Sequence, residues 1–259
     1  MTAGDGAAVR RLEDVDLEAY DFFDFGAGDG GSVRYCEKAF GGRGLGIDVK
    51  PSKAQAANDA GVEVVLGDIL ALPRRPLVRY VSMCDFLEHL PDDDLVREVL
   101  EVAAAVATDF IYIKHPSFED EAYLRALGLK QYWQDWKGHP SHLLLSDLTA
   151  MLTEVGARRL EIEYVRPITD SDDATVLPLD TPPDQGSYDP QLHGPKPHIV
   201  FEKPVHRAIN ITAHLDARGQ PLSADGWRQD AGPRRRGWSA RVRRLARRLV
   251  RDAARRLGR

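Results

Sequence analysis

The feature that most constrains the fold is a glycine-rich turn at residues 20–31, which reads YDFFDFGAGDGG. Its first half, residues 20–25, is a short aromatic and apolar run that favours a buried strand, and a helix is expected from Ser32. Glycines at the end of a strand leave backbone N–H groups uncovered, and the following helix brings the positive end of its dipole to the same point. The turn therefore predicts a site for a polar, partly anionic ligand of the nucleotide type.

Strand-like and helix-like segments alternate along the first half of the chain. Strands are expected at residues 20–25, 45–48, 62–66, 78–83 and 110–113, and helices at 32–40, 51–60 and 92–107. A further helix at 143–155 and strands at 159–165 and 198–202 follow. This alternation predicts an α/β protein whose parallel sheet is covered on both sides, with ligands at the carboxyl ends of the strands.

Three short motifs follow the expected strands. Asp48 ends the second strand, Gly67-Asp68-Ile69 follows the third, and the run CDFLEHLPDDD begins at Cys84 after the fourth. A carboxylate about twenty residues past the glycines suits the hydroxyls of a ribose. The glycines at 26, 28 and 31 also satisfy G-x-G-x-x-G, a pattern that alone is a weak signal for a nicotinamide-dependent oxidoreductase.

In this order, the four motifs resemble those of class I S-adenosylmethionine-dependent methyltransferases, over roughly residues 20–115. The resemblance implies a three-layer Rossmann-like fold with a mostly parallel seven-stranded sheet, whose last strand is antiparallel and inserted beside the fifth. It also implies that S-adenosylmethionine is the cofactor. The cofactor-binding residues by this resemblance are Asp24, Gly26, Ala27, Gly28, Asp48, Val49, Asp68, Ile69 and Cys84. The nicotinamide alternative explains the glycines and Asp48 but not Asp68 or the LEH run at 87–89, so the methyltransferase resemblance is preferred to it.

The resemblance assigns a role to each cofactor-side group. Asp24 is expected near the amino end of the methionine, and the backbone of residues 26–28 around the amino-acid portion. Asp48 is expected to bind the ribose hydroxyls, and Asp68 to face the adenine. Cys84 is expected to present its backbone beside the sulfonium, while its thiol is a small buried structural group.

Methyl transfer to a hydroxyl benefits from a base, and histidine is the natural candidate near neutral pH. Four histidines follow the fourth and fifth expected strands and are the candidate catalytic residues: His89, His115, His139 and His142. A structural role competes for each of them; His89, for example, equally suits a cap of the helix that opens at Pro91. Tyr132, Trp133 and Trp136 lie among them, and aromatic faces beside polar groups suit a sugar or a phenol.

These residues predict O-methylation of a saccharide, a glycolipid or another small hydroxylated acceptor. An N-methyltransferase of a small molecule and a module that binds the cofactor without turnover are the alternatives.

A metal is a further alternative at the run after the fourth strand. Asp85, Glu88 and His89 have a D-x-x-E-H spacing similar to the E-x-x-E-H at which ubiquinone-biosynthesis O-methyltransferases bind a divalent metal. If the segment is helical, the three side chains lie on one face and could share a cation. Because Asp is shorter than Glu, and because acids more often open a helix than bind a metal, a solvated helix start is preferred and no metal ligand is assigned.

The chain divides into four parts by composition. Residues 1–19 are interpreted as a polar leader, with a short helix near 12–19. Residues 20–204 form the methyltransferase domain, with acceptor-site insertions at 114–142 and 166–197, the second of them a flap or a disordered loop. Residues 205–232 are interpreted as a linker that opens with a short strand pair, and residues 233–259 as an arginine-rich amphipathic tail.

Charge and composition indicate where the protein works. The tail holds 12 of the 35 Lys and Arg residues and one acid, Asp252, so its net charge is +11. Because the whole chain has a net charge of −5, the remainder carries −16. The apolar stripe among the tail arginines predicts binding to an anionic membrane surface, and nucleic acid is disfavoured. No apolar run spans a bilayer, no signal peptide opens the chain, and two cysteines fit a reducing compartment. A cytoplasmic protein, peripheral at the inner face of the membrane, is expected.

Overall fold

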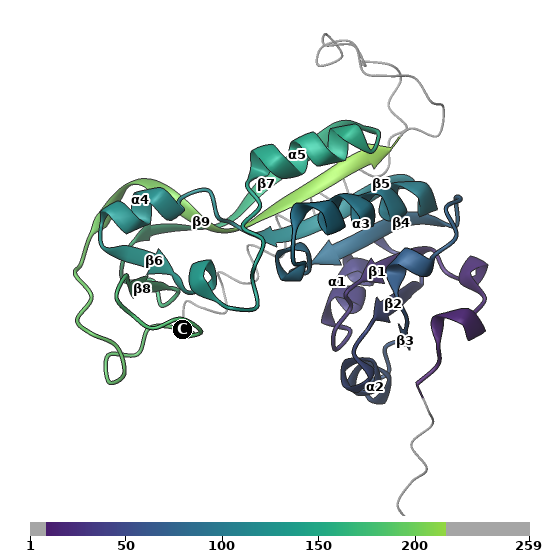
Figure 1. Cartoon of the computed structure of the whole chain (residues 1–259), viewed down its shortest axis with the longest axis horizontal. Coiled ribbons are helices and arrows are strands. Elements are labelled where there is room, and N and C mark those ends of the chain that lie inside the picture. The colour runs from purple at the N-terminus through teal and green to yellow at the C-terminus, as the bar shows by residue number, and fades with distance from the viewer. Residues whose placement is uncertain (1–8, 216–259) are drawn as a thin grey trace, which may run out of the picture.

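The structure is a computed structural model that describes residues 9–215. Its centre is a seven-stranded sheet in the order β3-β2-β1-β4-β5-β9-β7 (Figure 1). The strands are β1 (Phe22–Phe25), β2 (Gly44–Asp48), β3 (Val64–Leu66), β4 (Val78–Cys84), β5 (Ala107–Pro116), β7 (Ala157–Asp170) and β9 (Val200–Leu215). The first five are mutually parallel, and β9 is antiparallel to both β5 and β7. The predicted α/β fold, with an antiparallel last strand inserted beside the fifth, is confirmed.

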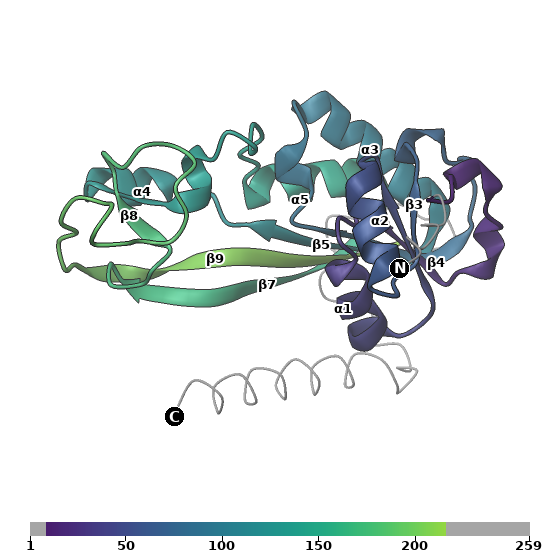
Figure 2. The ribbon, with the colours of Figure 1, turned by 90° about the horizontal axis from the view of Figure 1, so that it is seen from below.

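Helices cover both faces of the sheet (Figure 2). Helices α3 (Asp93–Val106) and α5 (Leu145–Glu154) lie on one face, and α1 (Gly31–Phe40) and α2 (Pro51–Asp59) belong to the other. In α3 the buried residues Val96, Val99, Val102 and Val106 recur at helical spacing, and Asp92 caps the helix by accepting a hydrogen bond from Leu95 N at 2.9 Å. The apolar faces of these helices form two separate cores, which hold the strand ends in fixed positions.

A small lobe stands at the far end of the sheet (Figure 1). It contains α4 (Glu121–Ala126) and a two-stranded sheet of β6 (Leu129–Gln131) and β8 (Val176–Pro178), which pair antiparallel. The extended ends of β7 and β9 run into it. Its own apolar core comprises Leu124, Leu129, Ile168, Val176, Phe201 and Val205. The two predicted insertions, 114–142 and 166–197, are therefore one structural unit, because β6 comes from the first and β8 from the second.

Two predictions about the ends of the domain are wrong. Residues 205–215, predicted to open a linker with a short strand pair, are strand, but they belong to the domain, because they continue β9 to Leu215 between β5 and β7. Pairing on both sides holds this segment extended, and Val205, Ile209, Ile211 and Ala213 are buried in it. The helix predicted near residues 12–19 is instead two single 3-10 turns, Leu12–Asp14 and Leu17–Ala19.

The rest of the predicted linker, residues 216–232, and the arginine-rich tail lie outside the described residues. Within residues 9–215, no helix is both long and apolar enough to cross a membrane.

Candidate active site

The glycine turn joins β1 to α1 at the carboxyl edge of the sheet. The N–H groups of Gly26 and Ala27 donate to Ile47 O at 3.0 and 3.3 Å, which ties the turn to the end of β2. Gly26 has a φ of +69°, and a Cβ placed on it would lie 2.1 Å from the ring of Phe86. Phe86 follows β4, so its ring lies directly against the glycine turn. Only glycine fits there, both for its positive φ and for this close approach.

Asp48 is the carboxylate at the tip of β2, and it faces the same turn. Its Oδ2 accepts a hydrogen bond from Gly28 N at 2.8 Å, and its Oδ1 accepts one from Lys50 N at 2.7 Å. The structure thus brings together two residues that the sequence predicted for one cofactor, although twenty positions separate them. A carboxylate beside backbone N–H groups at a strand tip can accept hydrogen bonds from ribose hydroxyls.

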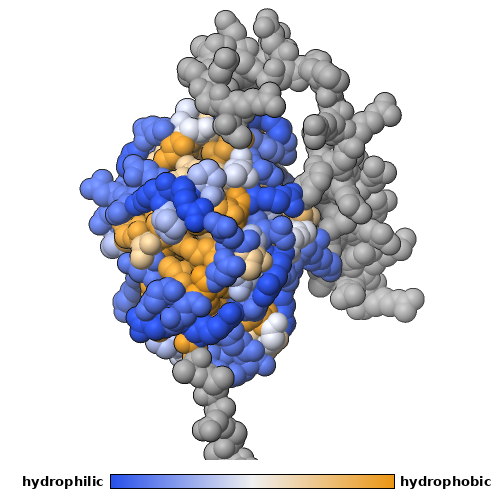
Figure 3. Space-filling view, turned by 90° about the vertical axis from the view of Figure 1, so that its right-hand side faces the viewer, coloured by the Kyte–Doolittle hydropathy of each residue, from blue (hydrophilic) through white to orange (hydrophobic). Residues whose placement is uncertain are grey.

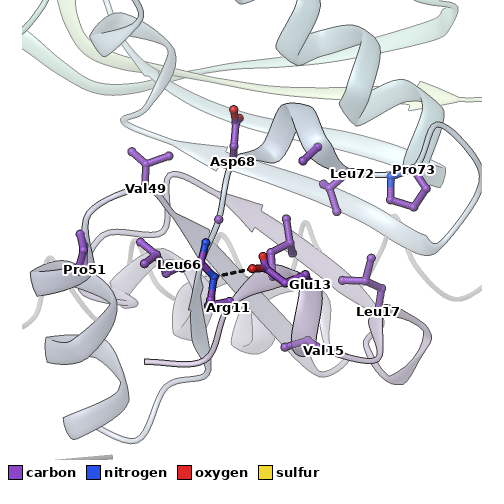
Figure 4. Close-up of a pocket in the computed structure, with 13 residues that line it drawn as sticks. Arg11, Glu13, Val15, Leu17, Val49, Pro51, Leu66, Asp68, Leu72 and Pro73 are labelled. Carbon is purple, nitrogen blue, oxygen red and sulfur yellow. Dashed lines mark hydrogen bonds and ion pairs between the residues drawn. The ribbon is translucent and has the colours of Figure 1, made fainter. Parts of the chain in front are cut away.

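A pocket of about 640 Å³ opens next to Asp48. Val49 and Asp68, both predicted to contact the cofactor, line it. The other lining residues are Arg11, Leu12, Glu13, Val15, Leu17, Pro51, Leu66, Gly67, Ala71, Leu72 and Pro73. In the close-up, Val49 and Pro51 lie on one side of the pocket and Leu17 and Pro73 on the opposite side (Figure 4). A mostly apolar hollow with a few polar groups suits a flat heterocycle such as adenine.

The N-terminal segment supplies one wall of this pocket. Leu12 is buried, Arg11 forms a bridge with Leu66, and Leu66 N donates to Arg10 O at 2.9 Å. Seen from this end of the molecule, apolar side chains gather in the middle of the face, and polar ones surround them (Figure 3). Residues 9–19, interpreted from the sequence as a polar leader, are therefore part of the candidate site. The apolar residues Leu12, Val15 and Leu17 were the only signal for this role.

Three predicted cofactor residues have side chains that point into the protein. Asp24 is fully buried, and the hydroxyls of Ser32 and Ser82 donate to its two oxygens. Burial raises the pKa of Asp24 to about 6 despite these hydrogen bonds. Ile69 is buried in the core. A hydrogen bond with the Cys36 thiol, together with burial, raises the pKa of Cys84. The buried side chains of Asp24 and Ile69 therefore pack beneath the turn and the pocket, and neither side chain lines the pocket.

On the acceptor side, two of the predicted histidines meet. The rings of His89 and His139 lie edge to face, with centroids 4.8 Å apart. One ligand-capable atom each from Glu88, His89 and His139 lie within 4.8 Å of one another. His89 Nδ1 lies 2.6 Å from Gly138 O, and His139 Nδ1 lies 3.0 Å from Trp133 O.

These contacts define the tautomer of both rings. A carbonyl oxygen only accepts hydrogen bonds, so Nδ1 of each histidine carries the proton and donates it. In a neutral imidazole this leaves Nε2 with a free lone pair. Burial lowers the pKa of His139, which favours its neutral form. Both rings are thus prepared to accept a proton or to bind a cation through Nε2.

Glu88, a member of this cluster, also forms a buried pair with His115. His115 is fully buried and Glu88 is 1% exposed, and His115 Nδ1 lies 3.4 Å from Glu88 Oε2. Glu88 Oε2 and both ring nitrogens of His115 have no hydrogen-bond partner within the described part of the chain. Buried polar groups are rarely left in this state unless they serve a function.

His142, the fourth predicted histidine, lies apart from the others. Its ring stacks on Phe118 at a centroid distance of 4.4 Å, and its Nδ1 lies 3.2 Å from Glu121 Oε2. The structure therefore brings His89, His115 and His139 to one place, whereas His142 contacts Phe118 and Glu121.

The aromatic residues of this segment divide by exposure. Trp133 is buried and donates from Nε1 to Ser117 O at 2.9 Å, so it anchors the segment. Tyr132 and Trp136 are half-buried, and Trp136 lies 6.4 Å from the His139 ring. These two rings are the ones that a sugar or phenol could reach.

The helical arrangement considered for Asp85, Glu88 and His89 is wrong. Only residues Leu87–His89 form a single 3-10 turn, and Asp85, with a φ of +51°, lies outside it. The Asp85 carboxylate is instead paired with Lys114. His139, fifty residues from His89 in the sequence, takes the place beside Glu88 and His89 that Asp85 was considered for.

Comparison with known proteins agrees with this architecture. No family model matches the chain, and no curated protein matches it in sequence. Among solved structures, a SAM dependent methyltransferase from Archaeoglobus fulgidus has a TM-score of 0.52 and 20% identity, over 80% of this chain and 86% of that chain. A SAM-dependent methyltransferase from Methanosarcina mazei has a TM-score of 0.47 and 15% identity, over 79% of this chain and 96% of that one.

A magnesium protoporphyrin IX methyltransferase from Synechocystis has a TM-score of 0.46 and 13% identity, over 79% of this chain and 78% of that one. The chain has the Rossmann-like fold of class I S-adenosylmethionine-dependent methyltransferases. At these identities, the likeness of the Archaeoglobus structure establishes the fold alone.

Proposed function

We propose that the protein is an S-adenosylmethionine-dependent methyltransferase that methylates a hydroxyl of a small acceptor, such as a saccharide or a glycolipid. The observation that carries this proposal is the contact between Asp48 and Gly28 N at 2.8 Å, beside a pocket lined by Val49 and Asp68. The glycine turn, the carboxylate and the apolar pocket are adjacent, in the order that an amino acid, a ribose and an adenine require.

These residues would hold S-adenosylmethionine along this edge of the sheet. Val49 and the apolar pocket would bind the adenine, the Asp48 carboxylate would accept hydrogen bonds from the ribose hydroxyls, and the backbone of the glycine turn would bind the amino-acid portion. Bound there, the cofactor would supply an electrophilic methyl group. The loop after β4, which carries Glu88 and His89, would face the acceptor.

Transfer then requires a deprotonated acceptor oxygen in line with the methyl group. The acceptor O–H gives its proton to a base at the histidine cluster, where the free Nε2 of His89 or His139 can accept it. The oxygen forms a bond to the methyl carbon while the carbon–sulfur bond breaks, and its electron pair stays on sulfur. The products are a methyl ether, neutral S-adenosylhomocysteine and an imidazolium. Positioning of donor and acceptor supplies most of the rate enhancement.

The preference for a hydroxylated ring rests on Tyr132 and Trp136. Both rings are half-buried, and the centroid of the Trp136 ring lies 6.4 Å from that of His139. Aromatic faces stack on the apolar faces of sugars and phenols. The lowered pKa of His139 favours an oxygen acceptor, because it keeps the ring able to accept a proton and a hydroxyl depends on loss of its proton more than an uncharged amine does.

The test is a methyl-transfer assay with the full chain and deuterium-labelled S-adenosylmethionine. Acceptors are saccharides, catechols and primary amines of matched size, and products are followed by mass spectrometry. Label on a hydroxyl oxygen, lost in the Asp48→Ala variant, is the expected result. Label on amines only would replace the proposal by N-methylation. Binding of the cofactor without transfer to any acceptor would support a non-catalytic module.

We also propose, from the sequence alone, that residues 233–259 bring the protein to anionic membranes. The tail carries +11, and its apolar residues alternate with arginines at helical spacing. Flotation of the full chain with phosphatidylserine vesicles should fall as salt rises, and replacing the tail arginines with glutamine should abolish it. Equal flotation of both proteins would contradict this proposal.

A further inference from the structure

Two imidazoles and a carboxylate converge where the turn after β4 meets residues 132–142. A ligand-capable atom of Glu88, one of His89 and one of His139 are mutually within 4.8 Å. Such a separation is compatible with three ligands around one ion, because metal–nitrogen and metal–oxygen bonds are about 2.0–2.2 Å long. Among the described residues, one other group has this property, namely Asp24, Cys36 and Cys84, and the oxygens of Asp24 are already bonded to serines.

Glu88 provides an independent sign that a partner belongs here. Its side chain is 1% exposed, and no donor in residues 9–215 forms a hydrogen bond with its Oε2. His115 Nδ1 lies 3.4 Å from this oxygen and does not form a hydrogen bond with it. A buried carboxylate oxygen without a hydrogen bond is costly, whereas a cation beside it offsets that cost.

The histidines are held in the form that binds metals. Each donates its Nδ1 proton to a backbone carbonyl, His89 to Gly138 and His139 to Trp133. Metal-binding histidines commonly make this second contact, since it fixes the tautomer and directs Nε2 at the ion.

We propose that Glu88, His89 and His139 bind one first-row divalent transition-metal ion on the acceptor side of the site. Two nitrogens and one carboxylate oxygen suit Zn²⁺, Co²⁺, Mn²⁺ or Fe²⁺, whereas Mg²⁺ and Ca²⁺ prefer oxygen ligands throughout. Three protein ligands leave positions open. His89 is exposed, so these positions are accessible to a substrate.

The role of the ion rests on the proposed function. An acceptor hydroxyl bound at an open position has a lowered pKa and gives its proton to water, so an imidazole base is not needed while the ion is bound. The resulting oxygen forms its bond to the methyl carbon, the carbon–sulfur bond breaks, and the electron pair stays on sulfur. This step selects acceptors with a hydroxyl that can bind a metal, such as catechols and vicinal diols.

The test uses the full chain, stripped of metal with a chelator and titrated with CoCl₂. Bound Co²⁺ with nitrogen ligands absorbs visible light, so the spectrum reports the ligand set without any activity. We expect saturation at one equivalent and no displacement by excess MgCl₂. Glu88→Gln and His139→Gln should each weaken Co²⁺ binding by ~100-fold or more, since loss of second contacts alone costs about 10–100-fold.

His198→Ala is the matched control. His198 is exposed and, within residues 9–215, pairs with Asp172 alone, 3.0 Å away, so Co²⁺ binding should be unchanged. Circular dichroism shows whether Glu88→Gln folds. If it does not, Co²⁺ binding by His139→Gln is the test, because His139 is half-buried and its replacement should disturb the fold less. Failure of the wild-type protein to bind Co²⁺ at one equivalent, or equal affinity in the folded variants and the wild type, would overturn the proposal.

Calorimetry with S-adenosylmethionine on the same samples separates the two proposals. Cofactor binding without Co²⁺ binding removes only the metal site. Co²⁺ binding without cofactor binding removes the proposed function and leaves the metal site in place.

Discussion

The cofactor side and the acceptor side of the candidate site are assembled from different kinds of segment. On the cofactor side, the ligand groups follow β1, β2 and β3, three adjacent strands, and each lies within a few residues of its strand end. On the acceptor side, Glu88 follows β4, His115 ends β5, and His139 comes from a long segment beyond it. The first arrangement follows from the topology of the sheet, whereas the second depends on how one particular insertion packs.

The polar groups of the two sides also differ in their partners. Both oxygens of Asp48 and both oxygens of Asp24 accept hydrogen bonds from the protein. Glu88 Oε2 and both nitrogens of His115 have no such partners among residues 9–215. The cofactor side is thus satisfied by its own backbone and serines, while the acceptor side keeps unsatisfied buried groups. Groups of this kind are where an ion or a reacting proton is expected.

The largest effect is expected from the glycine turn. Gly26→Val places side-chain atoms on the Phe86 ring, where even a Cβ would approach to 2.1 Å, and forces a positive φ on a β-branched residue. Overpacking and backbone strain together should lower the free energy of unfolding by about 3–5 kcal/mol. Urea denaturation measures this loss.

Gly28→Ala is the comparison for this prediction. Gly28 also has a positive φ, but nothing lies within 4 Å of its Cβ position, so a loss of only about 1–2 kcal/mol is expected. Equal losses in both variants would show that Phe86 does not hold the turn.

Asp24 gives the cofactor-side counterpart of Glu88. Its pKa of about 6 in the folded protein exceeds its ordinary 3.8, so its contribution to stability is full below about pH 4 and is lost as pH rises through 6. Relative to Asp24→Asn, the wild-type protein should lose up to about 3 kcal/mol of unfolding free energy over this range. Denaturant titrations at several pH values test it, and a constant difference between the two proteins would contradict it.

On the acceptor side, His139→Ala should lower turnover by about 100-fold, with affinity for the cofactor changed less than about 2-fold. As the pH is lowered, the wild-type rate should stay constant to a pH below the one at which an exposed histidine becomes protonated. The reason is that burial lowers the pKa of His139, so its ring stays neutral there. Steady-state rates and calorimetry provide the two measurements.

His142→Ala sharpens this prediction. His142 stacks on Phe118 and does not belong to the cluster of Glu88, His89 and His139, so turnover of this variant should fall by less than about 10-fold. A larger loss than that of His139→Ala would move the acceptor to the Phe118 side.

A smaller effect is expected at the ribose site. Asp48→Asn keeps the shape of the side chain but replaces a charged acceptor, so affinity for S-adenosylmethionine should fall by about 10-fold with the fold intact. Asp59→Asn, in an exposed position at the end of α2, is the control and should bind as the wild type does. Unchanged affinity in Asp48→Asn would separate the carboxylate from the cofactor.

The sequence predicted the fold and the cofactor side well, because there the spacing of residues along the chain determines which strand end they occupy. The alternation of segments predicted the sheet, and the residues at strand ends predicted the meeting of Asp48 with Gly28, because parallel strands end at one edge. Local spacing also suggested Asp85 as a partner of Glu88, and this failed because residues 85–89 do not form a helix.

The remaining features depend on contacts distant in sequence. His89 and His139 are held together by contacts of their Nδ1 atoms with the carbonyls of Gly138 and Trp133. No local sequence pattern encodes this arrangement. The sequence predicted only a short strand pair at the start of a linker, whereas pairing with both β5 and β7 makes residues 205–215 part of the long strand β9. The same holds for residues 9–19, whose few apolar side chains became one wall of the pocket.

The most direct test of the account is calorimetry of the purified full chain with S-adenosylmethionine and, separately, with NAD⁺. We predict binding of one S-adenosylmethionine, competed by S-adenosylhomocysteine and weakened in Asp48→Ala, and no heat with NAD⁺. Binding of NAD⁺ without S-adenosylmethionine, or no change in Asp48→Ala, would contradict it.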